Sequence, residues 1–343
     1  MDTVFGINKK IERKLNWPVV TLGVFDGVHS GHREVIQKTI DLANKENGES
    51  IILTFDRHPK SFLSQTQQTC ITSLEHRLVL FEQLGVDVTV VLEFDKKIAE
   101  ITAEDFIAKV IHEWLGAKVV VLGFNCSFGK DRRGDALMVC NFAEKYGFEV
   151  VVCEPAEIEG EITSSTAIRK EIIQGDLQKA RGMLGRRVSV LGTVIKGDGR
   201  GMELGFPTAN LNLHHEIKPP SGVYATKAFL DGREYNAITN IGICPTFEKD
   251  TDDIEPLVEV HIIDFNESIY GKDLEVQFLY KLREEIKFEK DKFKFKIIYL
   301  DINKIDLREY KSKFKKHLKE KWAKYYTTNV NYLKDTQNIF KKI

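Results

Sequence analysis

The sequence predicts an α/β domain built on a parallel sheet, followed by a small closed β-barrel and a helical tail. In the first half of the chain, strand-like runs alternate with helical patterns, which is typical of a parallel sheet covered on both faces. In the second half, β-rich runs follow one another with turns between them, as in small barrels. A chain of 343 residues can hold two such domains. We expect the first domain over residues 1–182, the second over 183–305 and the tail over 306–343.

The composition is that of an ordinary globular protein, with 42% hydrophobic and 29% charged residues. A net charge of -1 gives no general reason to expect nucleic acid or an anionic membrane as a partner. The first residues lack the long apolar stretch of a signal peptide, so we expect none, and no run approaches the length of a membrane span. The five cysteines are scattered without a Cys-x-x-Cys pair, so we expect a reducing, cytoplasmic setting without structural zinc or disulfides.

The first element joins a strand to a helix. Residues 19–25 form a short apolar run that ends at Asp26-Gly27, which predicts a buried strand and a tight turn. Residues 33–46 carry apolar positions at helical spacing. His29 and His32 lie at the junction, where a helix N-terminus favours an anion. Two imidazoles at this spacing can both donate hydrogen bonds to one phosphate.

The rest of the first half repeats the alternation of strands and helices. We expect strands over residues 50–55, 86–92, 118–124 and 149–153, and helices over 72–84, 102–115 and 135–146. Ligands of parallel sheets bind at the carboxyl ends of the strands. Polar or glycine-rich segments follow three of these ends, at residues 26–27, 56–59 and 123–133. The segment 56–59 taken alone is also compatible with a plain turn.

A second candidate phosphate-binding element reads Thr-Ser-Ser-Thr-Ala-Ile-Arg-Lys over residues 163–170. Ser164, Ser165 or Thr166 can cap the following helix and offer hydroxyl and N–H groups to a phosphate. Arg169 lies one turn along and can make a bidentate phosphate contact. A routine helix cap with a solvated arginine is the alternative interpretation.

The second half begins with a short helix and a domain junction over residues 174–185. Strands are expected over residues 188–195, 223–230, 233–241, 257–264 and 274–282, with a hairpin turn at Asp231-Gly232. The segment 192–211 contains five glycines and ends in Pro-Thr-Ala-Asn. A loop of this composition can wrap phosphates with backbone N–H groups, although most glycine-rich loops are plain turns. It lacks the Gly-Lys-Ser/Thr ending of a Walker A loop.

Several of these motifs resemble one known family. Residues 23–32 (Gly-Val-Phe-Asp-Gly-Val-His-Ser-Gly-His) resemble the signature of the nucleotidyltransferase superfamily. They are most similar to the form of this signature in bacterial bifunctional riboflavin kinase/FAD synthetases. Residues 164–169 are similar to the second phosphate-binding element of that family. The segment Gly-Phe-Pro-Thr-Ala-Asn at 205–210 resembles the riboflavin kinase signature, and similar pieces follow at 220–224, 240–247, 259–261, 270–271 and 282–288. The resemblance extends over residues 19–301.

This resemblance implies a Rossmann-like nucleotidyltransferase domain, a riboflavin kinase barrel and two successive reactions. The barrel would phosphorylate riboflavin to FMN with ATP, and the N-terminal domain would transfer AMP from a second ATP to FMN, giving FAD. Mg²⁺ would be the metal cofactor. In the adenylyltransferase site, the resemblance implies that His29, His32 and Arg169 stabilise the transition state and the phosphates. In the kinase, it implies that Glu259 is the general base.

The resemblance also implies the remaining site residues. ATP and phosphate contacts are expected from Gly23, Phe25, Asp26, Gly31, Ser164, Ser165, Thr166, Gly197, Gly199, Gly201, Thr208 and Asn210. Thr208 and Asn210 lie two residues apart in an extended segment and can hold Mg²⁺. Flavin contacts are expected from Phe55, His58, Pro59, Asn125, Phe128, Tyr224 and Arg283.

Three positions depart from the family pattern. Arg57 stands where proline is usual, Asn125 replaces an acid and Cys126 replaces an aromatic residue. Two alternatives therefore stay open: a riboflavin kinase whose adenylyltransferase domain is weakened or inactive, and a non-catalytic flavin- or RNA-binding regulator.

The tail extends beyond the resemblance. It is rich in lysine, with aromatic and apolar residues at helical spacing over 307–326. The simpler interpretation is an amphipathic helix packed on the barrel. The alternative is a docking surface for another subunit, RNA or an acidic membrane.

Overall fold

The computed structural model describes residues 1–7, 14–57, 59, 62, 69–158, 160–197, 207–242 and 257–284. The chain divides into two compact units. Unit 1 comprises Met1–Val190 together with His214–Ile217, and unit 2 comprises Leu191–Leu213 and Lys218–Ile343. The expected tail lies outside the described residues.

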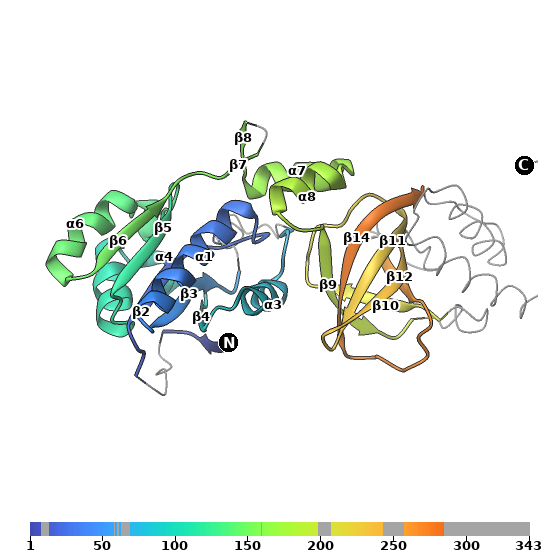
Figure 1. Cartoon of the computed structure of the whole chain (residues 1–343), viewed down its shortest axis with the longest axis horizontal. Helices are drawn as coiled ribbons and strands as arrows, with labels where there is room; N and C mark the ends of the chain where they lie inside the picture. Colours follow the sequence, from blue (N-terminus) through green and yellow to red (C-terminus); the bar gives the residue numbers. More distant parts are fainter. Residues whose placement is uncertain are drawn as a thin grey trace, which may run out of the picture. The chain divides into compact units, whose positions relative to one another are not determined.

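Unit 1 is built on a six-stranded sheet in the order β1-β4-β3-β2-β5-β6 (Figure 1). All of its strand pairings are parallel, as predicted. The strands are β1 (Asp2–Phe5), β2 (Pro18–Leu22), β3 (Glu49–Phe55), β4 (Val88–Leu92), β5 (Val119–Gly123) and β6 (Glu149–Cys153). The chain order reverses between β2 and β5, and such a switch point opens a crevice beyond the carboxyl ends of the strands.

Helices cover both faces of this sheet. The helices of unit 1 are α1 (Ser30–Lys45), α3 (Leu74–Leu84), α4 (Lys96–Glu100), α5 (Ala103–Asp105), η1 (Phe106–Trp114), η2 (Lys130–Arg132), α6 (Ala136–Tyr146), α7 (Ser165–Gln174) and α8 (Leu177–Leu184). Successive strand residues alternate between the faces. Val20 packs in one core cluster with residues of η1, whereas Val19 packs in another with residues of α1. Burial on both faces explains why these strands are continuously apolar.

The first strand and helix differ from the prediction at their junction. Strand β2 ends at Leu22, three residues before the predicted end, because the backbone turns away and Phe25 takes a positive φ of 53°. Helix α1 begins at Ser30, with His29 as its N-cap residue, so His32 lies in the first helical turn.

Other differences are smaller. The predicted helix over 102–115 is divided into α5 and the π-helix η1, whose wider turns still bury Phe106, Ile107, Val110 and Ile111 on one side. Strand β1, helix α4 and the short hairpin β7 (Glu157–Ile158) and β8 (Glu161–Ile162) were not predicted. Each has five residues or fewer, which is too short to show a clear period.

Unit 2 contains a closed barrel in the order β10-β13-β12-β11-β14-β9. Its strands are β9 (Ser189–Ile195), β10 (Ala209–Leu213), β11 (Gly222–Leu230), β12 (Arg233–Gly242), β13 (Leu257–Ile262) and β14 (Asp273–Arg283). The hairpin at Asp231-Gly232 is confirmed, since both residues have the positive φ of a two-residue turn, 49° and 75°. The parallel sheet and the closed barrel together confirm the predicted fold class.

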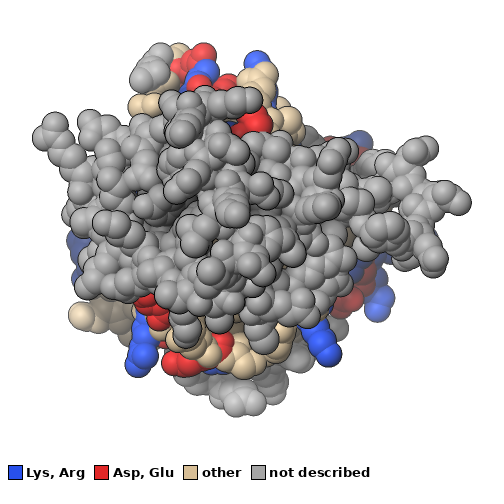
Figure 2. Space-filling model, turned by 90° about the vertical axis from the view of Figure 1, so that its right-hand side faces the viewer, with Lys and Arg blue, Asp and Glu red and all other residues tan. Residues whose placement is uncertain are grey.

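The visible charged residues carry both signs. Along the visible margin of the face drawn in Figure 2, both blue (lysine and arginine) and red (aspartate and glutamate) groups are present. In the described part of the chain, no helix combines the length and the apolar character needed to cross a membrane.

Candidate active sites

A pocket of about 450 Å³ opens at the carboxyl ends of the strands in unit 1. It lies at the switch point, because its lining includes Leu22 from the end of β2 and Gly123 from the end of β5. The predicted site residues that line it are Gly23, Phe25, Asp26, His32, Phe55, Pro59, Asn125, Phe128 and Ser165. Residues from four separate motifs therefore meet in one cavity.

His32 lines this pocket and stacks on His29, whereas His29 and Arg169 are not themselves part of the lining. The centroids of the two histidine rings lie 3.6 Å apart with an interplanar angle of 20°. Nδ1 of His29 accepts the backbone N–H of His32 at 3.4 Å, so His29 caps helix α1. This acceptor role places the proton of a neutral His29 ring on Nε2, where it is available to a ligand. Nδ1 of His32 is buried without a hydrogen-bond partner among the described residues, which favours a bound ligand there.

The phosphate loop, which we define as residues 23–28, fixes the position of His32. The Phe25 ring lies edge-on against His32 at 5.3 Å and against Phe81 at 5.8 Å. Gly23 permits this arrangement, since a Cβ atom at this position would lie 3.1 Å from the Phe25 ring. Gly31 packs beside the His29 ring, and a Cβ atom there would meet only ordinary van der Waals contacts.

Both histidines have lowered pKa values. Burial lowers the pKa of His29 from 6.5 to about 4. Burial, and secondarily the neighbouring His29 and Arg77, lower the pKa of His32 well below 6.5. At neutral pH the rings are therefore uncharged hydrogen-bond donors.

We expect this burial to make the stability of unit 1 depend on pH. The unfolded chain binds a proton at His29 as the pH falls below 6.5, but the folded chain does so only near pH 4. The free energy of unfolding therefore decreases as the pH falls through this window, by about 2 kcal/mol for His29 between pH 7 and pH 5. Urea unfolding of the wild type and of His29→Ala/His32→Ala, followed by tryptophan fluorescence at both pH values, tests this. The loss of stability should be smaller in the variant, and an equal loss in both proteins would contradict the expectation.

Arg169 and Ser165 from helix α7 are tied to Asp26. Nη2 of Arg169 donates to Oδ2 of Asp26 at 2.8 Å, and the Ser165 hydroxyl donates to the Asp26 carbonyl at 2.9 Å. The buried carboxylate of Asp26, a predicted phosphate-site residue that lines the pocket, accepts hydrogen bonds from Ile71, Thr72 and Arg169. Nε of Arg169 is buried and has no hydrogen-bond partner in the described part of the chain.

Helix α7 begins as the sequence predicts. Ser164 is its N-cap residue and accepts the N–H of Ala167 at 3.2 Å. The Thr166 side chain is exposed and free to reach a ligand. The helix N-terminus, the Arg169 side chain and the paired histidines together present hydrogen-bond donors suited to phosphate groups.

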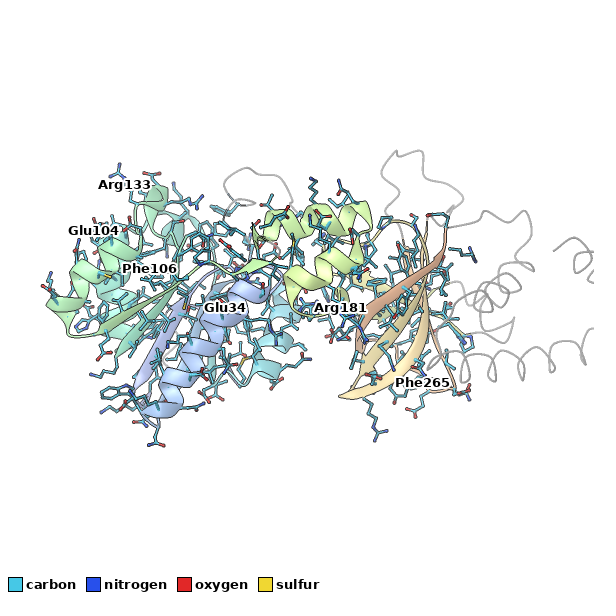
Figure 3. The ribbon with its side chains drawn as sticks, turned by 45° about the horizontal axis from the view of Figure 1, so that its top comes forward. Glu34, Glu104, Phe106, Arg133, Arg181 and Phe265 are labelled. Atoms are coloured by element: carbon cyan, nitrogen blue, oxygen red, sulfur yellow. The ribbon has the colours of Figure 1, made fainter. Side chains whose placement is uncertain are left out.

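An aromatic wall forms the other side of the pocket. Phe55 meets Phe94 edge-on at 5.5 Å, and Phe106 meets Phe128 at 5.5 Å (Phe106 is labelled in Figure 3). Asn125 and Cys126 line the same cavity. Burial raises the pKa of the Cys126 thiol to about 12, so this side chain is a neutral, apolar surface at physiological pH. Pro59 also lines the cavity, whereas His58 lies outside the described residues.

Sequence reasoning missed part of this lining. Phe94 follows β4 without any motif of its own, and its position depends on the packing of two other phenylalanines. Arg132 also lines the pocket, where its guanidinium donates to the Ser127 hydroxyl at 2.9 and 2.8 Å. In the sequence, only the position of Arg132 within the polar segment 123–133 indicated that it could line the site.

The barrel aligns a row of polar side chains across three strands. Glu259 of β13 lies opposite Asn210 of β10 on one side and opposite Asn240 of β12 on the other. Nδ2 of Asn240 donates to Oε2 of Glu259 at 3.2 Å. Residues in register point to the same face of the sheet, so the predicted general base and a predicted metal ligand are neighbours.

The Asn210 side chain is suited to a metal ion. It is 8% exposed, and its Oδ1 atom has no hydrogen-bond partner among the described residues. An amide oxygen of this kind and the Thr208 hydroxyl, two residues earlier, are the types of oxygen ligand that Mg²⁺ prefers. Gly197 lies directly against Asn210, and a Cβ atom at Gly197 would overlap the Asn210 amide.

A second pocket, of about 410 Å³, lies beside Thr208. It is lined by residues of β9, β10 and β13 and by the segment 265–270, which includes Phe265 (labelled in Figure 3). Thr208 is thus placed between a cavity and the polar row. Gly199 and Gly201 of the predicted phosphate-wrapping loop lie outside the described residues.

The structure describes the surroundings of the two flavin contacts predicted in the barrel, Tyr224 and Arg283. Tyr224 is 1% exposed, packs edge-on against Phe278 at 5.2 Å and donates its hydroxyl to the Pro220 carbonyl. These contacts give Tyr224 a packing role inside the barrel. Arg283, at the end of β14, donates to the Glu284 carbonyl at 2.9 Å and does not line the pocket beside Thr208.

Comparison with known proteins matches each half of the chain to a family model. A family model of FAD synthetase matches residues 11–167, and a family model of riboflavin kinase matches residues 184–305. The bifunctional riboflavin kinase/FMN adenylyltransferase of Haemophilus influenzae is 35% identical over 290 residues, which cover 84% of this chain and 92% of the relative. The chain belongs to the bifunctional riboflavin kinase/FMN adenylyltransferase family.

A second relative and a solved structure are also similar to this chain. The bifunctional riboflavin kinase/FMN adenylyltransferase of Listeria monocytogenes is 36% identical and covers 79% of this chain and 85% of its own. A crystal structure described as a macrolide-efflux protein from Streptococcus pneumoniae has a TM-score of 0.73 at 31% identity, covering 88% of this chain and 98% of that one. The resemblance inferred from the motifs is thereby confirmed.

Proposed function

We propose that this chain converts riboflavin to FMN in the barrel and FMN to FAD in unit 1, using ATP in both steps. The observation that carries the proposal is the presence of two separate groups of polar side chains, one in each unit. His32 and Ser165 line the pocket of unit 1, His29 stacks on His32, and Asp26 holds Arg169. In the barrel, Glu259 lies in register with Asn210 and Asn240.

In unit 1, a phosphate oxygen of FMN attacks the α-phosphorus of ATP, and the bond to the leaving pyrophosphate breaks. Such transfers depend mainly on positioning and on stabilising charge. His29 and His32 donate hydrogen bonds to the reacting phosphate, and Arg169 holds the leaving phosphates. The aromatic wall of Phe55 and Phe128 supports binding of a flat, apolar ring such as that of the flavin.

In the barrel, the 5′-hydroxyl of riboflavin attacks the γ-phosphorus of ATP and ADP leaves. Glu259 accepts the hydroxyl proton as the new P–O bond forms. Asn240 supports this role, because its amide donates to Oε2 of Glu259 and so helps to orient the carboxylate. Thr208 and Asn210 would hold Mg²⁺, which neutralises charge on the phosphates when bound.

We expect Asn210→Ala to raise the free Mg²⁺ concentration needed for half-maximal kinase rate by at least about tenfold, because an oxygen ligand is lost. Asn210→Asp keeps an oxygen at this position and should retain more of the wild-type dependence. Asn212→Ala is a matched control on the same strand, since Asn212 is exposed and points to the same face. A wild-type Mg²⁺ dependence in Asn210→Ala would remove the assignment of this ligand.

Chromatography of the flavins after incubation with riboflavin, ATP and Mg²⁺ tests the overall function. The proposal predicts FAD as the end product. FMN alone would indicate that only the kinase is active, as the departures at Asn125 and Cys126 allow. Unchanged riboflavin would favour a non-catalytic flavin-binding role.

A further inference from the structure

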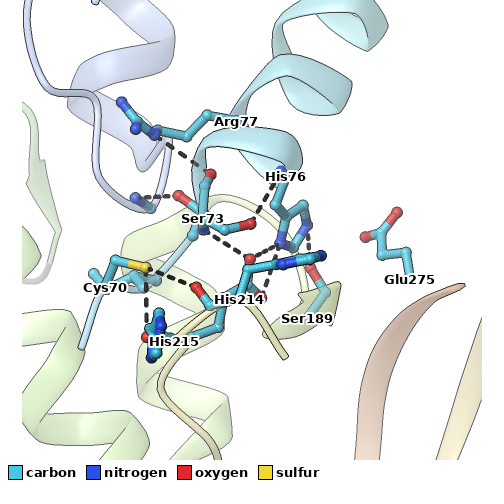
Figure 4. A network of polar contacts seen from close by, with 12 residues as sticks. Cys70, Ser73, His76, Arg77, Ser189, His214, His215 and Glu275 are labelled. Atoms are coloured by element: carbon cyan, nitrogen blue, oxygen red, sulfur yellow. Dashed lines mark hydrogen bonds and ion pairs between the residues drawn. The ribbon is translucent and has the colours of Figure 1, made fainter. Parts of the chain in front are cut away.

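A buried line of polar side chains runs through unit 1, and its members His76 and Ser189 are labelled in Figure 4. Nδ1 of His76 lies 2.9 Å from Oε1 of Glu216, and Nε2 of His76 lies 3.2 Å from the Ser189 hydroxyl. All three side chains are buried, at 0%, 2% and 4% exposure. Buried polar groups are costly unless they are satisfied, so a connected set of this kind fixes the positions of its members.

The hydrogen bonds of this line run in one direction. The guanidinium of Arg186 donates to the Ser189 hydroxyl at 3.1 Å, Ser189 can donate to Nε2 of His76, and Nδ1–H of His76 can donate to Glu216. A serine, a histidine and an acid in this order also occur in hydrolases. Here Ser189 is enclosed and already accepts a hydrogen bond from arginine, so it cannot attack a substrate.

Two sets of contacts connect this line of side chains to the phosphate loop. At one end, Nη2 of Arg186 donates to the Gly27 carbonyl at 2.9 Å. At the other end, Glu216 accepts the backbone N–H of Ser73 at 2.7 Å and so fixes the start of helix α3. The residue before Ser73 is Thr72, whose hydroxyl accepts the N–H of Gly27 at 2.8 Å.

The loop that these contacts hold is strained. Phe25 and Val28 have φ values of 53° and 40°, in a region that β-branched residues in particular avoid. Such conformations persist only where the surroundings restrain them. Ile71 and Thr72 add to the restraint by donating backbone N–H groups to Oδ1 of Asp26, the residue that also orients Arg169.

We propose that Glu216, His76 and Ser189 are positioning residues for adenylyl transfer, because they hold the strained phosphate loop from both sides. This inference rests on the proposed reaction at His29 and His32. Arg186, Ser189 and Glu216 lie within residues 184–305, the range matched by the riboflavin kinase model. The adenylyltransferase unit therefore takes part of its support from sequence that the domain match assigns to the kinase.

Ser189→Ala tests the proposal with little change in volume. The turnover number for FAD formation from FMN should fall by about ten- to a hundredfold, the effect of moving reacting groups by roughly 1 Å. The KM for FMN should change little, because the aromatic wall lies elsewhere in the pocket. Riboflavin kinase activity of the same variant should stay at the wild-type level, which provides an internal control for folding.

Ser50→Ala is the matched control. Ser50 is 0% exposed, and its hydroxyl donates to Asp87 at 2.7 Å and accepts the Asp87 N–H at 3.0 Å. It lies near the start of β3, whereas the phosphate loop follows the end of β2 in the same parallel sheet. Both variants should have lowered melting temperatures, but only Ser189→Ala should lose turnover when assayed well below melting.

Variants of Glu216 separate positioning from general destabilisation. Glu216→Ala should lose turnover as Ser189→Ala does, and Glu216→Gln should restore part of it because its amide oxygen can still accept from Ser73. Wild-type turnover in Ser189→Ala, or an equal loss in Ser50→Ala, would overturn the proposal. If Glu216→Ala does not fold, the serine pair alone decides. FAD formation that survives loss of both His29 and His32 would refute the proposed site instead, so the two failures are distinguishable.

Discussion

Replacing His29 and His32 with alanine should abolish FAD formation and leave riboflavin phosphorylation intact. In the proposed mechanism each ring donates a hydrogen bond to the reacting phosphate, and loss of one such donor typically lowers turnover by about a hundred- to a thousandfold. We expect each single variant to lose this much, and the double variant to have no measurable adenylyl transfer from FMN. The measurement is the initial rate of FAD formation from FMN and ATP.

The control for this experiment is His112→Ala. His112 lies in η1 and stacks on Tyr146 at 4.5 Å, so its replacement removes an imidazole from the same unit but not from the pocket. His112→Ala should form FAD at the wild-type rate. If the double variant still forms FAD at that rate, the assignment of the histidines is incorrect.

Glu259→Gln should have the opposite effect on the two activities. Glutamine is close to glutamate in shape but cannot accept the proton of the riboflavin hydroxyl, and loss of a general base costs about a hundred- to ten-thousandfold in rate. FMN formation from riboflavin should fall by this factor, whereas FAD formation from added FMN should be unchanged.

Glu234→Gln is the corresponding control in the barrel. Glu234 belongs to β12 and pairs with Lys227 while exposed at the surface. Its neutralisation should leave both activities unchanged. Normal phosphorylation of riboflavin by Glu259→Gln would exclude this residue as the base.

Much of the adenylyltransferase site could be predicted from the sequence because its parts are local. A strand that ends at Asp26-Gly27 and a helix that follows place His29 and His32 together without any distant contact. The cap at Ser164 is equally local. What could not be predicted is that Asp26 binds Arg169 and two backbone N–H groups, because these partners lie 143, 45 and 46 residues away.

In the barrel, too, some features could be predicted from the sequence and others could not. The motifs identified Asn210 and Glu259, but only the strand register makes them neighbours and brings Asn240 beside them. Tyr224 also belonged to a motif, but the motif did not indicate that its ring packs against Phe278. The pairing of His76 with Glu216 joins residues 140 positions apart and had no local signal.

Complementation between two inactive variants tests the central claim, that one chain carries two separate sites acting in succession. Neither His29→Ala/His32→Ala nor Glu259→Gln alone should convert riboflavin to FAD. An equimolar mixture of the two, given riboflavin, ATP and Mg²⁺, should form FAD, because FMN released by the first variant is a substrate for the second. Failure of the mixture to form FAD, with each variant retaining its remaining activity, would contradict the account.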